Sequence, residues 1–587
     1  MKTKHLFLSA LTCLAFAACS NDDDAVQNPQ SEVVDKQYLA VQFTIPGLAE
    51  TRADVFETAN ETELAVSDVA FFFFNDNGNT AANPCYVTIA DAKNFWKNSI
   101  SHTHPENSDE AESSLVLLVE KAQPNLSQVV AVLNPTSEIR DLAGGNAKTP
   151  TDDEVDIDGS ATIMSTLTLE NLRKEVLSVE TDESKTYYSV PSLTAVDTYA
   201  DNSKCLMSNS AYYSDGGAPV YATQVGNALS ESREEALSTP LTIHVERVEA
   251  RVSVTPPALG GETAYELRTK AGGDEINAEN GGTDIKLYFQ LTGWWLNNTS
   301  KDAYLIKQLA TTYAAGWNNS AHFRSYWGVS WAEGTAADGL NKGQKYGSAN
   351  LFDKYCLENT TATSYTYADK SKDNNTGVDV TTATQLVAEG QIVDSEGNGV
   401  SVVSFNNTFY TVDEFLKVVA ATLNSNGYLN GVNQVTYTDL KMSIAAADDN
   451  NLRDYEAKVM VADEVTLTKD DVDANEEVNT MLSTVYGNVK YWNEGKTYYY
   501  TRIKHDYAAD GTYSSTPATD AIIRNHWYKI SITGFYGLGT PVSNPDIPII
   551  PVTPPTDKIS YLACNIAVLK YRVVSQDVSL GGDNSQQ

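Results

Sequence analysis

Hydrophobic and polar residues alternate along several stretches of this chain, and the longest such stretch lies near its C-terminus. Between Lys558 and Leu580 the even positions are apolar at first, and the odd positions take over after residue 568. Alternation with a period of two predicts a strand with one buried face. A slip of one residue indicates a bulge, or a strand that serves two pockets in succession. The apolar positions are Leu562, Cys564, Ile566, Val568, Leu569, Tyr571 and Val573, followed by Val578 and Leu580.

A proline-rich segment comes just before this strand. Six prolines lie within the sixteen residues from Pro541 to Thr556. Such a composition favours an extended, semi-rigid spacer, so we expect the chain to end in an apolar strand held away from its own body. Two interpretations remain open: a last strand that folds back after a stiff loop, and a strand meant for another molecule.

The first half of the chain predicts a sandwich of strands. Tyr38–Pro46 alternates, with Leu39, Val41, Phe43 and Ile45 on one face. The apolar run Asp68–Phe74 is typical of a central strand buried on both faces. Further segments are expected as strands (Ser114–Glu120 and Gln128–Leu133), as a helix (Ala161–Val179) and as a loop or short strand (Ser203–Ala211).

The second half repeats this order. Leu241–Val254 is a long alternating strand, and after a polar interval Ile285–Leu296 is a central aromatic strand. We therefore expect two similar β-sandwich domains in tandem, with strands divided by Gly, Asn, Asp and Pro turns. The second domain is enlarged by a polar region at about 300–480. Within the second domain we expect a helix at Thr411–Leu423, and Lys496–His505 paired with Ala521–Phe535.

Composition narrows the class of protein. The chain has 587 residues, which predicts two or three domains, and tyrosine (32) outnumbers phenylalanine (16), which favours β structure. The formal net charge of −36 argues against nucleic acid as a partner, because a polyanion would be repelled.

The N-terminus predicts export. Lys2 and Lys4 precede an apolar run that ends at Ala18, the pattern of a secretory signal too short for a stable membrane span. Phe16-Ala17-Ala18-Cys19 resembles a lipoprotein cleavage box, in which the thiol of Cys19 carries the lipid. An ordinary signal peptide with a chance cysteine is the alternative. Four later cysteines are far apart, so spacing does not decide their pairing, and buried single thiols are the expectation: Cys85, Cys205, Cys356 and Cys564.

Taken together, these segments resemble the minor-fimbrium shaft subunits of the Bacteroidales fimbrillins, which build type V pili. The resemblance covers nearly the whole chain. Its carriers are the box ending at Cys19, the site Thr51-Arg52-Ala53, the strand VERVEARVSV, the block IIRNHWYKISI, the proline spacer and the terminal IAVLKYRVVSQDVSL. Phe16 departs from the more usual leucine. A tip or anchor subunit of the same fimbrium is not separated from a shaft subunit by these motifs, although the intact C-terminal strand favours the shaft.

The resemblance implies an all-β-dominated fold of two tandem transthyretin-like β-sandwich domains with some helical insertions and an extended C-terminal donor strand. It implies a signal peptide (1–18), a lipid tether and first strand removed on maturation (19–52), two domains (53–240 and 241–540), a proline-rich linker (541–557) and the donor strand (558–587). It also implies a lipoprotein precursor in the outer membrane that an Arg-specific surface protease cuts between Arg52 and Ala53. The mature subunit would polymerise head to tail with itself, associate with fimbrial tip and anchor subunits and with host or bacterial receptors, and support adhesion and biofilm formation. The membrane is contacted only through the lipid anchor.

The physics of the sequence supports this mechanism independently. A cut after Arg52 would detach Tyr38–Pro46 and leave a sandwich with an open apolar groove and unpaired backbone groups. About five apolar side chains of a donor strand, at roughly 1.5–3 kcal/mol each, would make that groove a strong acceptor. Lys558–Leu580 of a neighbouring subunit has the length and pattern to fill it, by strand addition in trans. Because donor and acceptor differ, the contact would build an open filament.

Other chemistry finds little support. Asp471, Asp473 and Asn475 lack the glycine and the bidentate glutamate of a calcium loop, and His102 and His104 have no third ligand, so we expect no metal. No catalytic or cofactor motif is present, and we expect a non-enzyme without cofactors. The second hypothesis is a surface lipoprotein that binds glycans, with Trp294-Trp295 and Trp327–Trp331 as a stacking platform, although core packing is the expectation for these tryptophans.

Overall fold

The structure is a computed structural model of the chain. It describes residues 36–44, 65–89, 112–120, 126–145, 147–149, 154–156, 166–178, 205–309, 318–325, 327–331, 340–341, 346–350, 353–361, 364–367, 378–444, 457–487, 489–505, 519–541 and 561–569. Strands dominate these residues, as the sequence predicted. None of their helices is long and apolar enough to cross a membrane.

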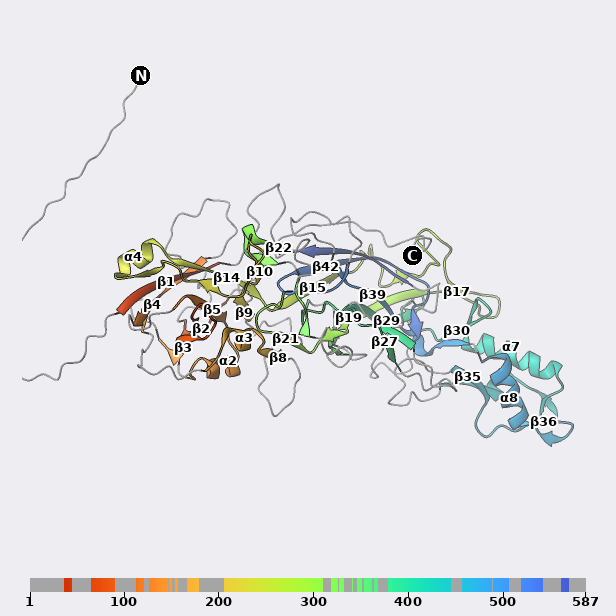
Figure 1. The fold of residues 1–587 in the computed structure, drawn as a ribbon. Helices are drawn as coiled ribbons and strands as arrows, with labels where there is room; N and C mark the ends of the chain where they lie inside the picture. The colour runs from red at the N-terminus through yellow and green to blue at the C-terminus, as the bar shows by residue number, and fades with distance from the viewer. Residues whose placement is uncertain are drawn as a thin grey trace, which may run out of the picture.

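An eleven-stranded sheet organises the N-terminal part (Figure 1). Its main path is β6-β3-β2-β5-β9-β14-β1-β4-β7, with β12 beside β5 and β13 beside β1. The strands are β1 (Lys36–Thr44), β2 (Asp68–Phe74), β3 (Thr80–Thr88), β4 (Glu112–Glu120), β5 (Gln128–Leu133), β6 (Ala147–Lys148), β7 (Glu154–Asp156), β9 (Met207–Asn209), β12 (Thr223–Gln224), β13 (Leu229–Ser230) and β14 (Leu241–Arg247). We call this the N-terminal sheet region. It also holds β8 (Val176–Ser178), β10 (Tyr212–Tyr213), β11 (Pro219–Val220), α2 (Ser137–Leu142), α3 (Leu169–Arg173) and α4 (Arg233–Ser238).

Several predicted strands of this region are confirmed. The apolar run Asp68–Phe74 is β2, buried at every position and flanked by β3 and β5. The predicted helix at Ala161–Val179 is wrong in extent, because the described helix α3 covers only Leu169–Arg173 and the chain then enters strand β8. The β-branched Val176 favours that change to an extended backbone.

Two six-stranded sheets face each other in the C-terminal part. One has the order β24-β20-β26-β15-β42-β44, and the other has β16-β19-β29-β39-β43 with β25 beside β19. The first comprises β15 (Glu249–Thr255), β20 (Thr299–Ser300), β24 (Leu340–Asn341), β26 (Lys354–Leu357), β42 (Trp527–Tyr536) and β44 (Tyr561–Leu569). The second comprises β16 (Tyr265–Glu266), β19 (Tyr288–Asn297), β25 (Tyr346–Asn350), β29 (Gln385–Val393), β39 (Lys496–Arg502) and β43 (Thr540–Pro541). We call these the C-terminal sheet region.

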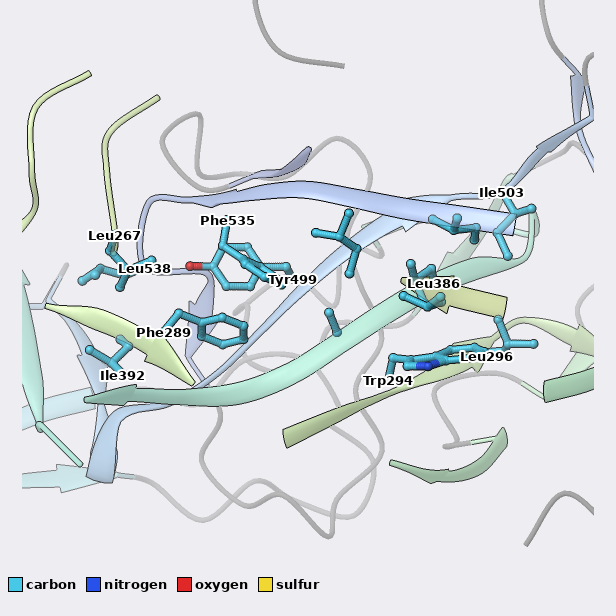
Figure 2. Close-up of a cluster of buried hydrophobic side chains, with 14 of the residues drawn as sticks. Leu267, Phe289, Trp294, Leu296, Leu386, Ile392, Tyr499, Ile503, Phe535 and Leu538 are labelled. Atoms are coloured by element: carbon cyan, nitrogen blue, oxygen red, sulfur yellow. The ribbon is translucent and has the colours of Figure 1, made fainter. Parts of the chain in front are cut away.

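The C-terminal sheets enclose one core. Side chains from both meet between them, among them Phe289 of β19, Leu386 of β29 and Phe535 of β42 (Figure 2). The ring centroids of Phe289 and Phe535 lie 4.5 Å apart, a favourable aromatic contact. Short strand pairs surround the core: β17 (Asn277–Ala278) with β18 (Ile285–Lys286), β22 (Asn318–Asn319) with β23 (Arg324–Ser325), β27 (Ser364–Tyr367) with β28 (Val378–Thr381), and β40 (Lys504–His505) with β41 (Thr519–Asp520). A short helix, η3 (Ser320–His322), joins β22 to β23.

A subdomain with helices is inserted between β29 and β39, and it lies at the end of the molecule opposite the N-terminal sheet region (Figure 1). Its apolar core is separate from that of the sheets. The predicted helix at Thr411–Leu423 is confirmed as α7. The elements are β30 (Val402–Phe405), β31 (Thr408–Thr411), α7 (Val412–Ser425), β32 (Leu429–Asn430), β33 (Asn433–Gln434), η5 (Tyr437–Asp439), β34 (Leu440–Ile444), β35 (Ala457–Val461), β36 (Leu467–Lys469), β37 (Val472–Asp473), α8 (Asn475–Val485) and β38 (Lys490–Trp492), with η6 (Asn493–Gly495) leading back.

Two strand predictions in the C-terminal part are wrong. Leu241–Val254 is not one strand: it breaks at Val248 into β14, which pairs with β1 and β9, and β15, which pairs with β26 and β42. The predicted strands Lys496–His505 and Ala521–Phe535 do not pair along their length, because β39 and β42 belong to different sheets. The end of the first predicted strand, β40, pairs instead with β41 (Thr519–Asp520), which lies just before the second predicted strand.

The division of the chain at 240/241 stays a prediction. β14, the first strand after this division, lies in the N-terminal sheet between β9 and β1. The chain therefore passes from one sheet region to the other at the bend between β14 and β15.

Candidate functional site

β1 is an interior strand of the N-terminal sheet. It pairs antiparallel with β4 over its whole length, from Lys36 opposite Glu120 to Thr44 opposite Glu112. On its other side it pairs first with β13 and then, in parallel, with β14. Backbone groups on both edges of β1 are therefore engaged, and removal of this strand would leave unpaired groups on β4 and β14.

The side chains of β1 fill the N-terminal core. Leu39, Val41 and Phe43 are fully buried, as the alternation predicted. The ring of Phe43 lies 6.0 Å from that of Phe71 on β2, centroid to centroid. Burial of three such side chains stabilises the strand by roughly 1.5–3 kcal/mol each. Ile45 lies outside the described residues.

The opposite face of β1 is also covered. Ala40 is fully buried against Ala236 of α4. The N-cap residue of that short helix is Ser232, whose hydroxyl accepts a hydrogen bond from the backbone N–H of Glu235 at 3.3 Å. Because β1 is covered on both faces and paired on both edges, it cannot leave its position in the uncut chain unless the sheet opens.

His244 of β14 lies opposite Thr44, the last residue of β1, in the parallel register. Its ring stacks on Phe323 with centroids 3.8 Å apart. Burial lowers the pKa of His244 to about 4, because a charged imidazole would lose its hydration there. His244 is thus neutral at physiological pH, and it lies on the face of β14 opposite to Ile243 and Val245, which pack in the N-terminal core.

The C-terminal strand is described from Tyr561 to Leu569 as β44, and it pairs antiparallel with β42 of its own chain. The expectation that this strand is held away from its own body is therefore wrong for this state, and the fold-back interpretation holds. Among the described strands β44 forms the edge of its sheet, with β42 as its one neighbour on the sheet path. A strand at an edge can leave without breaking a second ladder of hydrogen bonds.

The register agrees with the apolar pattern. The even positions Leu562, Cys564, Ile566 and Val568 lie opposite Phe535, Ile532, Ile530 and Tyr528, which are the core-facing positions of β42. Pairing at 568–569 is regular, because Val568 and Leu569 face Tyr528 and Trp527. The register shift lies instead on β42, between Ile532 and Gly534.

Several predicted site residues lie outside the described residues. These are the lipidation site Cys19, the cleavage site Arg52 and Ala53, and the later donor positions Tyr571, Val573, Val578 and Leu580. The spacer from 542 to 556 lies outside them as well, as do His102 and His104. The roles assigned to these residues stay predictions.

Most of the expected glycan platform is buried. Trp294 and Trp295 of β19 are fully buried and Trp327 is 2% exposed, whereas Trp331 is half-buried. Core packing, the expectation from the sequence, is confirmed for the three buried tryptophans. No group of three or more His, Cys, Asp or Glu side chains able to hold a metal occurs within the described ranges. Cys85, Cys205 and Cys356 are buried and form no disulfide, as expected.

Sequence reasoning missed the parallel neighbour of β1 and a set of buried charges beside it. Glu246, Arg247 and Glu249 flank the break at Val248, and each is at most 1% exposed. One signal was present in the sequence. Apolar residues occupy odd positions before residue 246 and even positions after it, and such a slip marks a change of sheet.

The C-terminal part of the sequence matches a family model. Residues 490–577, which include β39, β42 and β44, match "Major fimbrial subunit protein type IV, Fimbrillin, C-terminal". The resemblance to fimbrillins is confirmed by this match. The C-terminal strands of this chain are thus similar to the C-terminal region of fimbrillins, which are major fimbrial subunit proteins.

Solved structures with partial likeness include fimbrial proteins. A candidate cell adhesion protein from Parabacteroides distasonis is 12% identical, with 92% of this chain and 98% of that chain covered and a TM-score of 0.33. The tip fimbrial protein Mfa3 from Porphyromonas gingivalis is 9% identical, with 91% and 99% covered and a TM-score of 0.29. The fimbrial anchor protein Mfa2 from the same organism is 12% identical, with 61% and 99% covered and a TM-score of 0.19. Identities and TM-scores this low assign no function, and a comparison with curated protein sequences finds no match.

Proposed function

We propose that this protein is a structural subunit of a cell-surface fimbrium that assembles by strand exchange. An Arg-specific protease cuts the lipoprotein precursor between Arg52 and Ala53 and frees β1 together with the lipid on Cys19. The C-terminal strand of a neighbouring subunit, residues 558–580, then takes the place of β1. Repeated head to tail, this contact builds the shaft of the fimbrium.

The observation that carries the proposal is the position of β1. It is an interior strand of the sheet with a fully buried apolar face, yet it precedes Arg52 by only eight residues from Thr44. A cut there leaves it held by non-covalent contacts alone. The vacated position offers a donor two ladders of backbone partners and an apolar groove.

The direction of the donor also fits. β14 runs from Leu241 at the outer end of the N-terminal sheet to Glu246 and Arg247 beside the C-terminal sheet region, and β1 runs parallel to it. The spacer leaves the far end of the C-terminal sheet region after β43, beyond Tyr536. A donor arriving from the end of one subunit enters the outer end of the next, so it runs in the direction of the strand it replaces.

The spacer has the length for this step. Residues 542–560 span at most roughly 60 Å when extended. The donor must first leave β42, where its even positions already lie at core-facing register positions. The donor loses one ladder of hydrogen bonds when it leaves β42 and gains two when it fills the β1 position of the next subunit. Strand exchange is therefore favourable once β1 has dissociated.

The test compares the wild-type precursor with Arg52→Ala after treatment with an Arg-specific protease. We expect SDS-resistant ladders on unboiled gels and filaments by electron microscopy from the wild type alone. The resident β1 of the uncut variant has an effective concentration in roughly the millimolar range, so a donor in trans does not displace it.

The matched control is Arg52→Lys, which keeps the charge and removes the site for an Arg-specific protease. This variant should also stay monomeric. Filaments from either uncut variant at the wild-type rate would show that removal of β1 does not control assembly.

A further inference from the structure

One stretch of chain connects the two positions that strand exchange uses. β14 is the parallel neighbour of β1, and β15, which follows after Val248, is the parallel neighbour of β42. β42 in turn pairs with β44. A single covalent segment with one bend, β14–β15, therefore runs from the neighbour of the acceptor position to the neighbour of β42, and hydrogen-bond ladders complete the path to β44.

Buried ion pairs surround this bend. Glu246 accepts a hydrogen bond from Nζ of Lys307 at 2.6 Å, and both side chains are fully buried. Nε of Arg324 lies 3.9 Å from the same carboxylate. Arg524, just before β42, donates to Glu358 at 2.6 Å, and both are again fully buried. We call these five residues the bend cluster.

The bend cluster joins the two sheet regions. Glu246 belongs to β14 of the N-terminal sheet, whereas Lys307, Arg324, Glu358 and Arg524 come from the C-terminal part of the chain. Burial lowers the pKa of Lys307 to about 8, and Glu246 opposes that shift. Removal of the lysine while the site stays closed would leave Glu246 as an uncompensated buried charge, which is strongly unfavourable.

A segment of the C-terminal part also crosses onto the N-terminal sheet region. β21 (Asp302–Tyr304) pairs with β8, and the segment continues to Gln308. The carbonyl of Leu305 accepts hydrogen bonds from Ser208 of β9 at 2.6 Å and from Arg524 at 3.2 Å. We call residues 302–308 the crossing segment.

Apolar burial strengthens the same junction. Ala303, Leu305 and Ile306 of the crossing segment are fully buried in one core with side chains of the N-terminal sheet region. The members from that region include Phe72, Phe74, Leu172, Leu177 and Leu206. A shared core and buried ion pairs resist a hinge, whereas most domain pairs in one chain meet through more polar, separable surfaces.

We propose that the bend cluster and the crossing segment make the two sheet regions one load-bearing body, in which the strand β14–β15 carries tension from the acceptor position to the donor position. The load-bearing role rests on the proposed fimbrial function. The coupling of the two regions does not, because it is a property of the single uncut chain. In a filament, tension would act on the donor strand beside β14 and on the spacer that follows β42. It would be borne by the hydrogen-bond ladders at these two ends and by the covalent strand β14–β15 between them.

The experiment follows urea unfolding of the purified uncut precursor by pulsed thiol labelling and peptide mapping. Cys85 and Cys205 report on the N-terminal sheet region, and Cys356 reports on β26. All three are buried and form no disulfide. In the wild type we expect all three to become reactive at the same urea concentration. In Lys307→Met we expect the midpoints for the two regions to separate by at least roughly 1 M urea.

The matched control is Arg140→Met, which removes an ion pair to Asp68 at 2.7 Å within the N-terminal sheet region. In this variant the urea midpoints of thiol labelling at Cys85 and Cys205 should fall by no more than the midpoint at Cys356 falls. Arg524→Lys is a milder second variant of the bend cluster, because it keeps the charge. We expect it to separate the urea midpoints of the two regions by less than Lys307→Met does. It replaces Lys307→Met in the experiment if that variant does not fold. Separate midpoints in the wild type, or coincident midpoints in the folded bend variants, would overturn the proposal whether or not the protein polymerises.

Discussion

Phe43 is fully buried near the C-terminal end of β1, a strand that the proposed mechanism discards. In the uncut chain its ring packs against Phe71 and closes the N-terminal core. The same side chain stabilises the precursor and opposes exchange until the chain is cut. Under the proposed mechanism, single residues of β1 therefore affect the stability of the precursor and not that of the mature subunit.

Phe43→Ala should destabilise the uncut precursor by about 3–5 kcal/mol, because it removes a buried ring and leaves a cavity. After cleavage β1 is lost from both proteins, so mature filaments of the variant should have wild-type stability. Urea unfolding of the precursor and heating of the filaments in SDS measure the two effects. Gln42→Ala, at the neighbouring half-buried position, is the control and should change the precursor little. Equal losses in precursor and filament would contradict the replacement of β1.

His244 makes the stability of the N-terminal sheet depend on pH. Burial lowers its pKa in the folded chain to about 4 from its ordinary value of 6.5. Between these values the unfolded chain binds a proton that the folded chain does not, so stability falls as the pH falls from 6.5 towards 4. For His244 we expect a loss of up to about 3 kcal/mol over this range.

His244→Gln should reduce that pH dependence, measured as the difference in unfolding free energy between pH 7 and pH 4.5. Burial also lowers the pKa of His526, but this residue is present in both proteins, so its contribution to the pH dependence cancels in the comparison. An unchanged pH dependence in the variant would show that His244 is protonated as easily in the folded chain as in the unfolded one.

At the scale of elements, β44 pairs with β42 in its own subunit, and we propose that it fills the β1 position of the neighbouring subunit in the filament. Its even positions match the core-facing positions of β42. Removal of the strand therefore bares the edge of β42 beside Tyr528, Ile530 and Ile532, as well as removing the donor.

Deletion of residues 557–587 should give a secreted subunit that does not polymerise and whose C-terminal sheet region is less stable. Deletion of residues 570–587 alone is the control: it keeps β44 and should restore the stability, while any polymers should be weaker. Unfolding followed at Cys356, together with unboiled gels, separates the two effects. Filaments from the 557–587 deletion would show that the terminal strand is not the donor.

At the scale of the whole molecule, the two positions used in exchange lie in different sheet regions, joined through the bend at Val248 (Figure 1). This arrangement suits a subunit that passes load along a fibre. The formal net charge of −36 disfavours non-specific association between copies of the chain.

Delivery to the cell surface is proposed to depend on the lipid. Cys19→Ala should abolish lipidation and block surface assembly, because the precursor loses its route to the outer membrane. Metabolic labelling with a fatty acid and electron microscopy of whole cells measure the two results. Normal fimbriae on cells that carry the variant would refute this route, whereas Cys85→Ala should leave lipidation intact.

The sequence by itself determined the strands with a regular apolar period. β1, β2 and β5 were located within a few residues, and the faces of Leu39, Val41 and Phe43 were correct, because period-two alternation reports burial directly. The fimbrillin resemblance in the C-terminal region was also readable, since its motifs are contiguous.

Only the tertiary structure decided which strands are neighbours. Pairing between β1 and β14 joins residues about two hundred positions apart, and no local pattern encodes that choice. The pairing of β44 with β42 was also decided by the tertiary structure. The stiff spacer suggested that the C-terminal strand lies away from its own subunit, but the edge of β42 offers it unpaired backbone groups and a matching set of apolar positions. The buried charges at the bend were hidden for a related reason. Glu246 and Lys307 are ordinary surface residues by type, and their burial is stable only because folding brings each its partner.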